Sequence, residues 1–358
     1  VYHSLGDDGS IASIFTYSQN IGYDDVIICN NKQLGIDEGN IGIIGSGNFT
    51  KTTILPILKK LKANIKYISS SGGISSTQLA SKYGIQHSTT NFKKVLRDDK
   101  VDSVIIATRH DNHHELILES LKAKKQIFVE KPLCIYENQL DQIIRQYKKS
   151  KDSSIMIGFN RRFSSHSKAI KDSIGDNSGP INIIYTMNAG HIPKNHWVHD
   201  KDIGGGRIIG EACHAIDLCN FFTESKIKSI CVNSLGEIEN NKNDNVSILL
   251  RYNNGSNAIV NYFSNGSNKY SKERFEIFSN DRTWICDNYS KTIAYDVPRF
   301  KTLKTKVDKG HLQQFKLYMK KLKNGGDPLI SFDDIVNVTK ATFAVSKSNT
   351  KGVWIDIK

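Results

Sequence analysis

The sequence predicts an α/β protein in two parts, an N-terminal parallel sheet wound with helices and a C-terminal α+β domain on an open, mostly antiparallel sheet. Between residues 40 and 157, short apolar runs alternate with helical patterns, which is typical of parallel strands joined by crossover helices. The first apolar run leads into Gly45-Ser46-Gly47. After Ile157 the strand patterns follow one another, and Asn253-Asn254-Gly255 supplies a hairpin turn. A chain of 358 residues is long enough for two such domains.

The N-terminal pattern predicts four strands, each followed by a helix. The strand segments are apolar without alternation, as expected of strands that are buried on both faces of a sheet. In the first helix Ile54, Leu58 and Leu61 form one apolar stripe, and we expect Pro56 to bend this helix. The predicted strands are 41–44, 65–68, 104–107 and 126–129, and the predicted helices are 48–62, 75–82, 114–121 and 137–147.

The C-terminal pattern predicts short strands in antiparallel succession and three helices. One helix runs from Glu211 towards Phe222, and another ends before Gly325-Gly326. We therefore assign residues 39–157 to a dinucleotide-binding domain and residues 158–358 to a domain for substrate binding and oligomerisation. The predicted strands are 182–187, 247–252, 258–263 and 275–278, and the other two helices are 311–322 and 333–346.

Residues 1–38 resist assignment. The run 26–29 is apolar enough for a strand but stops at Asn30-Asn31, and the chain begins at Val1 rather than Met. The segment is either a lone strand or the remnant of a preceding domain. Neither an export signal nor an apolar run of membrane-spanning length is visible. Six cysteines are scattered without C-x-x-C spacing, so we expect reduced thiols, a cytoplasmic location and no membrane partner.

The formal net charge is +13, from 49 Lys and Arg against 36 Asp and Glu. A nucleic-acid-binding protein would concentrate this charge on one face with aromatic residues interleaved. Here the lysines occur in small groups late in predicted helices, where cations suit the negative end of the helix dipole. We interpret them as solvated helix faces, with steering of an anionic substrate as a second interpretation, and expect no nucleic acid partner. The groups are Lys59-Lys60, Lys93-Lys94, Lys124-Lys125, Lys148-Lys149 and Lys320-Lys321.

The glycine-rich turn after the first strand predicts a site for the pyrophosphate of a dinucleotide. Gly45 permits the tight turn and Gly47 lets the backbone approach the phosphates, which then lie at the start of a helix with Asn48 and Phe49. Thr50 replaces the last glycine of G-x-G-x-x-G, a position that serves packing rather than phosphate contact. Within a strand–helix–strand unit this predicts a Rossmann fold that binds NAD or NADP.

The end of the second predicted strand leaves the choice between NAD and NADP open. An acidic residue there would bind the ribose 2′-hydroxyl of NAD, but this chain has a serine run that includes Ser70 and Ser71. No carboxylate is present to repel the 2′-phosphate of NADP, and no arginine follows that would bind this phosphate. The serines also fit an ordinary loop.

Polar residues follow the third and fourth predicted strands at the same edge of the sheet, where open α/β sheets bind ligands. Thr108, Arg109 and His110 follow the third strand, and His113 either lies with them or begins the next helix. Lys131 follows the fourth strand, in Glu130-Lys131-Pro132. It could orient a substrate hydroxyl or stabilise an alkoxide, or it could form a salt bridge with an acid. Pro132 makes a cis peptide possible.

His214 is a candidate for proton transfer in the second domain. On a helix it would neighbour Glu211 and Asp217, three residues to either side, and these acids could orient its imidazole. A histidine on an apolar helix face is more often a satisfied core residue, but the preceding glycines and the flanking acids favour function here.

A loop that contains His191 and Trp197 precedes these glycines. Two further histidines, His196 and His199, lie in it, but their irregular spacing does not specify convergent zinc ligands. We expect the loop to cover a substrate and predict no metal.

With these motifs the chain resembles the glucose–fructose oxidoreductase / inositol dehydrogenase (Gfo/Idh/MocA) family from about Asn40 to the C-terminus. The motifs are Gly45-Ser46-Gly47-Asn48, Glu130-Lys131-Pro132, Gly158-Phe159-Asn160-Arg161-Arg162-Phe163 and the glycine run that leads to His214. The resemblance implies a substrate between the two domains, Lys131 and His214 as catalytic residues, and Glu130 and Arg161 near the nicotinamide. The family often carries an aspartate where this chain has Gly210. Either Glu211 takes over its role or the substrate class differs.

A closer likeness is to the oxidoreductase half of two-part proteins from surface-polysaccharide gene clusters, on the segments 188–193 and 206–214. It implies that Asn188 and His191 contact substrate together with Trp197, Arg161, Glu211 and Asp217, and that residues 1–38 end a missing dehydrogenase domain. The expected activity is hydride transfer between a nicotinamide and a secondary alcohol or ketone of a sugar or nucleotide sugar. The alternatives are a non-catalytic NAD(P) sensor of the same fold and, less favoured, a nucleic-acid-binding protein. We expect a homo-oligomer through the open sheet.

Overall fold

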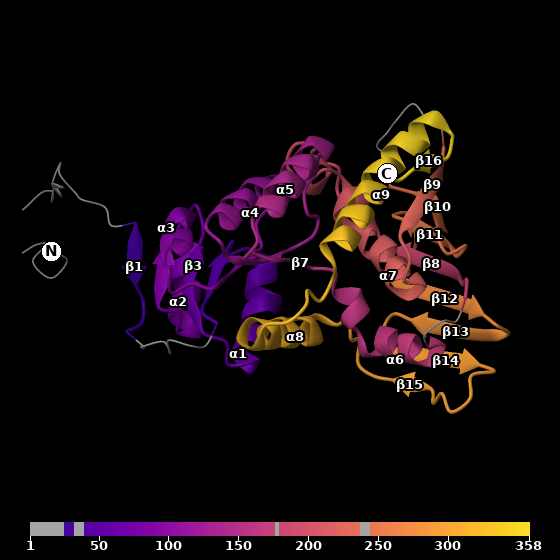
Figure 1. Cartoon of the computed structure of the whole chain (residues 1–358), viewed down its shortest axis with the longest axis horizontal. Coiled ribbons are helices and arrows are strands. Elements are labelled where there is room, and N and C mark those ends of the chain that lie inside the picture. The colour runs from indigo at the N-terminus through magenta and orange to yellow at the C-terminus, as the bar shows by residue number, and fades with distance from the viewer. Residues whose placement is uncertain (1–24, 32–38, 176–178, 237–243) are drawn as a thin grey trace, which may run out of the picture.

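The computed structural model describes residues 25–31, 39–175, 179–236 and 244–358. Two sheets lie at opposite ends of the molecule, and helices α7 (Cys213–Thr223) and α9 (Phe332–Lys351) lie between them (Figure 1). The predicted division into a parallel and a mostly antiparallel sheet is confirmed. The expectation of a missing preceding domain falls on residues outside the described part of the chain.

The first sheet has seven strands, and all neighbours are parallel except the edge pair β1–β4. The four predicted strands are present, and β4 and β7 were missed because each has only three residues. The run at 26–28 forms the antiparallel edge strand. In sheet order the strands are β1 (Val26–Ile28), β4 (His87–Thr89), β3 (Ile65–Ser69), β2 (Ile41–Ile44), β5 (Ser103–Ile106), β6 (Gln126–Val129) and β7 (Ile155–Ile157).

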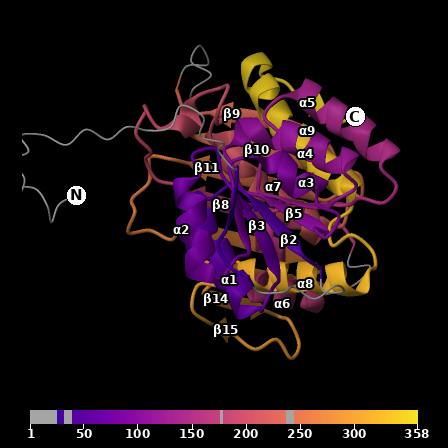
Figure 2. The ribbon, with the colours of Figure 1, turned by 90° about the vertical axis from the view of Figure 1, so that its left-hand side faces the viewer.

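Helices cover both faces of this sheet, with α4 and α5 on one side and α1 on the other (Figure 2). The helix predicted over residues 48–62 is present as one helical run over residues 48–60, and its part Thr50–Ile54 is a π-helical turn that precedes α1. Pro56 lies directly after this turn, in the first turn of α1. The helices are α1 (Leu55–Lys60), α2 (Ile74–Tyr83), α3 (Phe92–Arg97), α4 (His113–Lys122) and α5 (Glu137–Lys149).

Helix α8 (His311–Asn324) returns from the C-terminal half and packs beside α1 on the first sheet (Figure 2). Phe315 stacks on Phe128 of β6, with ring centroids 4.7 Å apart. The Tyr318 hydroxyl lies 2.7 Å from the Ser103 hydroxyl of β5, so a buried hydrogen bond joins helix and sheet. Residues about 200 positions apart therefore share one core, and α8 links the two halves of the chain.

Within the described residues the second sheet has nine strands, and all neighbours are antiparallel except the pair β8–β11. Four of these strands were predicted and five were missed. Helices α3 and α6 (Ser165–Ile174) were missed as well. In sheet order the strands are β15 (Leu303–Lys304), β14 (Lys291–Tyr295), β13 (Arg282–Asp287), β12 (Glu273–Ser279), β8 (Asn182–Asn188), β11 (Asn257–Phe263), β10 (Val246–Tyr252), β9 (Ile227–Ser234) and β16 (Ile355–Asp356).

Helices cover only the inner face of this sheet, and its other face points away from the first sheet (Figure 1). On the uncovered face Ile184, Ile259 and Leu249 lie directly opposite one another on the neighbouring strands β8, β11 and β10. Ile184 is 40% exposed and Leu249 is 39% exposed. The side-chain alternation of the strands thus leaves an apolar row in solvent.

The packing of α3 against β2 predicts a cost for any side chain at Gly42. An added Cβ would lie 2.2 Å from Cγ1 of Val95, a stiff and fully buried side chain. We expect Gly42→Ala to lower the free energy of unfolding in urea by about 1–3 kcal/mol through overpacking. Gly72→Ala is the matched control, because no atom lies within 4 Å of a Cβ there. Equal losses in both variants would contradict this account of the interface.

Candidate functional site

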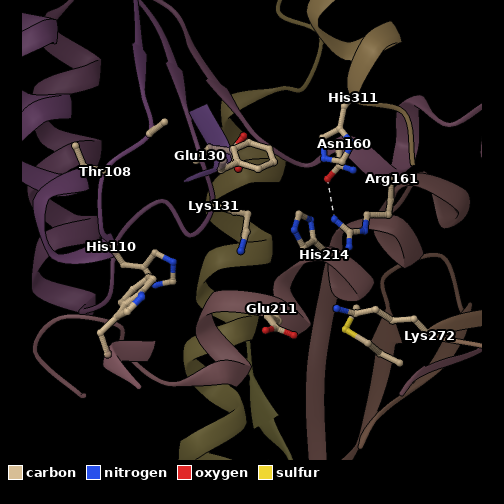
Figure 3. Close-up of a pocket in the computed structure, with 14 residues that line it drawn as sticks. Thr108, His110, Glu130, Lys131, Asn160, Arg161, Glu211, His214, Lys272 and His311 are labelled. Carbon is tan, nitrogen blue, oxygen red and sulfur yellow. Dashed lines mark hydrogen bonds between the residues drawn. The ribbon is translucent and has the colours of Figure 1, made fainter. Parts of the chain in front are cut away.

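A cavity of about 400 Å³ lies between the carboxyl edge of the first sheet and the start of α7 (Figure 3). Both halves of the chain supply its walls, and strands β5 and β6 end at it. The lining residues are Phe49, Ala107, Thr108, His110, Glu130, Lys131, Asn160, Arg161, Met187, Trp197, Glu211, His214, Lys272 and His311. Nine of them were predicted as site residues from the sequence. The motifs that contain them lie at the ends of predicted strands, in the loop with Trp197 and on the helix with His214.

The glycine turn has the geometry expected of a phosphate cradle. Gly45 has φ +111°, and a Cβ there would lie 2.4 Å from the Ala107 carbonyl oxygen, so only glycine fits. A Cβ on Gly47 would meet no atom within 4 Å, which leaves open space beside the backbone. The Thr50 hydroxyl donates to the Gly45 carbonyl at 2.9 Å and braces the turn from inside. Asn48 begins the following helix, so these residues fit a dinucleotide pyrophosphate.

The loop after β3 carries hydroxyl groups and no acid at its tip. The Ser70 hydroxyl donates to the Ser76 hydroxyl at 3.0 Å, and the Ser46 and Ser75 hydroxyls lie 2.5 Å apart. Ser71 is exposed. The loop therefore faces the glycine turn with neutral hydrogen-bonding groups, which suit a ribose hydroxyl and do not repel a phosphate.

Lys131 reaches across the cavity to the second half of the chain. Its ammonium donates to the Gly210 carbonyl oxygen at 2.8 Å. The Lys131-Pro132 peptide is cis, as the sequence allowed. His113, the first residue of α4, is fully buried and its Nδ1 lies 2.7 Å from the Pro132 carbonyl oxygen. His113 therefore supports the turn that carries Lys131 rather than facing the cavity.

Gly210 lies in a π-helical turn, Ile208–Ala212, which precedes α7. A Cβ at this position would lie 2.9 Å from Cε1 of His110. His110 is itself fixed, because its Nδ1 lies 2.7 Å from the Gly204 carbonyl oxygen and its ring packs edge-on against Trp197 at 4.9 Å. The space next to residue 210 is therefore taken by an imidazole, which excludes an aspartate there unless His110 moves.

His214 lies beside Lys131 in the cavity wall, and the charge of that lysine acts on it (Figure 3). Burial holds the pKa of His214 well below its usual value, and the nearby cations Arg161 and Lys131 lower it further. The imidazole is therefore neutral near neutral pH and able to accept a proton. Its Nδ1 is enclosed without a hydrogen-bond partner among the described residues, which leaves Nε2 as the nitrogen that can meet a ligand.

The two acids expected to orient His214 do not do so. Asp217 accepts from Nε of Arg162 at 3.0 Å and also pairs with its Nη2, and it does not line the cavity. Glu211 lines the cavity, but its carboxylate accepts from the Tyr262 hydroxyl at 2.9 Å and lies 3.4 Å from Nη2 of Arg207. Glu211 lies in the π-helical turn before α7, and its carboxylate is engaged by Tyr262 and Arg207 rather than by His214.

Glu130 lies in the cavity wall behind Lys131. Its burial raises the pKa of the carboxyl to about 7, although Lys131 and Arg161 oppose that shift. A Cβ on Gly158 would lie 2.7 Å from Oε2 of Glu130, so the glycine of the Gly158–Phe163 motif makes room for this carboxyl group.

Arg161 is held by a buried acid that the sequence analysis did not single out. Glu273 is fully buried and accepts from Nε of Arg161 at 3.1 Å and from Nη2 at 3.0 Å. The Lys309 ammonium and the Tyr185 hydroxyl each donate to the same carboxylate at 2.5 Å. These donors hold the pKa of Glu273 well below its usual value. Nη1 of Arg161 donates to Oδ1 of Asn160 at 2.8 Å.

The remaining predicted site residues fall in three places. Thr108 lines the cavity, and Arg109 lies over the Trp197 ring at 5.6 Å. His191 is exposed and does not line the cavity. Asn188 is also outside it, because its amide donates to the Ser267 carbonyl oxygen at 2.7 Å and braces that loop. Asp217, Asn188 and His191 therefore lie outside the cavity wall, and the structure does not support them as substrate contacts.

Five lining residues were not predicted as site residues. Ala107 directly follows β5, and the other four are Asn160, Met187, Lys272 and His311. They come from a 3-10 turn, from β8, from the residue before β12 and from the first turn of α8, so no local spacing connects them. Asn160 lies within the motif 158–163, which carried the family resemblance.

No group of metal ligands occurs among the described residues, and no described helix is long and apolar enough to cross a membrane.

This arrangement is that of an oxidoreductase with a dinucleotide cofactor. A family model described as an oxidoreductase family with an NAD-binding Rossmann fold matches residues 39–159, and a model of the GFO/IDH/MocA C-terminal domain matches residues 179–284. The chain belongs to the GFO/IDH/MocA family.

Relatives and solved structures support this assignment. Myo-inositol 2-dehydrogenase of Thermotoga maritima is 23% identical, covering 86% of this chain and 95% of that protein. The scyllo-inositol 2-dehydrogenase (NAD(+)) of Bacillus subtilis is 31% identical over 46% of this chain and 47% of its own length. The structure of levoglucosan dehydrogenase in complex with NADH and levoglucosan has a TM-score of 0.76 at 20% identity, covering 89% of this chain and 99% of that one, and shows the same fold.

Because Glu273 is the shared partner of Arg161 and Lys309, we expect it to contribute to stability in a pH-dependent way. Glu273→Gln leaves two cations without their shared counter-charge, so we expect a loss of about 3–5 kcal/mol at pH 7 in urea unfolding. The wild-type carboxylate has a depressed pKa, so its stabilisation is present above the unfolded value of about 4.3 and is lost as the pH falls below it. The difference between wild type and variant should therefore shrink by about 1 kcal/mol at pH 3.5.

The matched control is Glu276→Gln on the same strand. Glu276 pairs with Arg274 at the surface, with a side-chain exposure of 29%, so its loss should cost less than about 1 kcal/mol. Equal effects of the two substitutions, or a difference that does not change with pH, would contradict the assigned role of Glu273.

Proposed function

We propose that the protein transfers a hydride between a nicotinamide dinucleotide and a secondary alcohol or ketone of a sugar. The observation that carries the proposal is that Lys131 and His214, supplied by the two halves of the chain, line one cavity at the carboxyl edge of the first sheet. The names of the relatives, which are dehydrogenases of inositols and of levoglucosan, support a polyol or sugar substrate.

His214 and Lys131 have different roles in the oxidation of the substrate alcohol. When bound in this cavity, a nicotinamide would supply the acceptor for the hydride. His214 is neutral, so its Nε2 can take the hydroxyl proton of the substrate. Lys131 can donate a hydrogen bond to the substrate oxygen and stabilise the negative charge that develops there, as it now donates to the Gly210 carbonyl. In the reverse direction the same groups return the proton to a carbonyl oxygen.

The cofactor is assigned to the glycine turn and to the strand ends around it. Gly45, Gly47 and Asn48 would hold the pyrophosphate, and Ser70 and Ser71 would face the adenosine ribose. Phe49, Thr108 and Glu130 then lie along the path to the cavity, where the nicotinamide would meet the substrate. Because the ribose loop is neutral, we propose that both NAD and NADP are accepted. A nucleotide-linked sugar of surface-polysaccharide synthesis remains our proposed substrate class.

Replacement of Lys131 tests the catalytic assignment. We expect Lys131→Ala to lower kcat by about 10²–10⁴-fold, because the oxygen loses its charged donor, while NADH or NADPH fluorescence still reports cofactor binding. The control is Lys122→Ala at the end of α4, an exposed lysine paired with Glu119. Unchanged turnover in Lys131→Ala would remove this residue from the mechanism, and cofactor binding without turnover of any sugar by wild type would favour a sensor.

We further propose that the uncovered face of the second sheet pairs with a second copy of the chain. The support is the apolar row of Ile184, Ile259 and Leu249, which crosses three neighbouring strands and in which Ile184 and Leu249 are exposed. A charged residue in place of Ile184 would have to be buried in such an interface.

Sedimentation velocity tests this association. Wild type should sediment as a dimer or larger assembly, and Ile184→Asp should shift it to monomer. Tyr270→Asp is the control, since Tyr270 is 56% exposed but lies in a loop outside the sheet. A monomeric wild type, or an assembly that Ile184→Asp leaves intact, would contradict the proposal.

A further inference from the structure

Among the described residues, Lys272 is the cation of the cavity wall that has no acid paired with it. It is exposed, and its ammonium extends into the cavity from the residue before β12 (Figure 3). The other two cations of the lining already have partners, since Arg161 is held by Glu273 and Lys131 donates to the Gly210 carbonyl. Within the described part of the chain, Lys272 forms no ion pair and its ammonium donates no hydrogen bond.

The acids of the cavity wall are already engaged elsewhere. Glu211 accepts from Tyr262 and pairs with Arg207, which is buried and does not line the cavity. Glu130 is partly protonated near neutral pH, because burial raises its pKa to about 7. The cavity histidines are neutral, since burial lowers the pKa of His110 to about 3 and that of His311 to about 4. The wall therefore carries an excess of positive charge around a free ammonium.

The position of Lys272 separates it from the groups that act on the reacting carbon. Lys131 follows β6 of the first sheet and His214 lies on α7, whereas Lys272 enters the cavity from the end of a strand of the second sheet. In the view of Figure 3, His214 lies between Lys131 and Lys272. The backbone N–H of Asn188 in β8 donates to the Lys272 carbonyl at 2.8 Å, so the backbone of Lys272 continues the strand pairing of the sheet. A rigid strand end therefore presents this ammonium.

We propose that the substrate is a sugar with an anionic substituent, and that Lys272 binds this substituent while Lys131 and His214 act on a hydroxyl elsewhere on the ring. The inference rests on the proposed sugar dehydrogenase function and narrows its substrate class. A carboxylate of a sugar acid and a phosphate of a sugar phosphate or nucleotide sugar share the required chemistry. An ammonium is a compact point charge with three donors, which suits either group.

Binding to the cofactor-loaded protein tests the proposal without relying on turnover. The NADH- or NADPH-loaded full chain is titrated with glucose, glucuronate and glucose 6-phosphate, and cofactor fluorescence reports binding. We expect at least one anionic sugar to bind about 10-fold more tightly than glucose, with an advantage that declines between 50 mM and 500 mM salt. The carboxylate and phosphate arms distinguish the two sources of the anion.

Three variants assign this preference to Lys272. Lys272→Ala should abolish the advantage of the anionic sugar, and Lys272→Arg should retain most of it because the charge remains. Lys269→Ala is the matched control, an exposed lysine of the same loop that does not line the cavity. It should leave the preference unchanged.

The outcomes separate this inference from the catalytic proposal. Equal or undetectable binding of anionic and neutral sugars, or a preference that survives Lys272→Ala, overturns the anionic substrate. If neutral sugars are turned over in a Lys131-dependent reaction, the dehydrogenase function stands without it. If the Lys272-dependent preference is found but no sugar is oxidised or reduced, anion recognition stands and the catalytic proposal fails.

Discussion

The hydrogen bond from Lys131 to the Gly210 carbonyl is the contact on which the site depends, because it joins the two halves of the chain at the cavity. One partner follows a strand of the first sheet, and the other lies in a π-helical turn of the second half. Residue 210 can have no side chain while His110 occupies the adjacent space. The lysine therefore meets backbone where the family often has a carboxylate, and its ammonium stays close to His214.

Burial determines the protonation states around this contact. His214, His110 and His311 are neutral because a charged imidazole would lose its hydration there and would face cations. Arg161, by contrast, is buried in its charged form, because the fully buried carboxylate of Glu273 pairs with its guanidinium. The cavity thus combines neutral proton acceptors with fixed positive charge, a setting suited to an oxyanion that forms during hydride transfer.

The regular parts of the fold were predictable because their signal is local. The four long apolar strands of the first sheet and the helices α4, α5 and α8 follow from runs and periodicity that a few neighbouring residues carry. The missed strands are short, as β4 and β7 are, or polar on one face, as β13 and β14 are, and the sheet rather than the segment stabilises them. Close to Pro56 the predicted helix contains a π-helical turn, Thr50–Ile54, which the apolar periodicity did not predict.

By itself the sequence determined the order of strands and helices, the glycine turn, and the placement of Lys131 and Thr108 at one edge of a parallel sheet, since strand ends and turn chemistry are local properties. Only the tertiary structure decided which polar groups pair. Asp217 pairs with Arg162 rather than with His214, and Glu273 pairs with Arg161. Lys272 lines the cavity and forms no ion pair within the described part of the chain. The physical reason is that each of these pairs joins residues far apart in the chain, so their partners are chosen by how the two sheets pack and by which charges that packing removes from water.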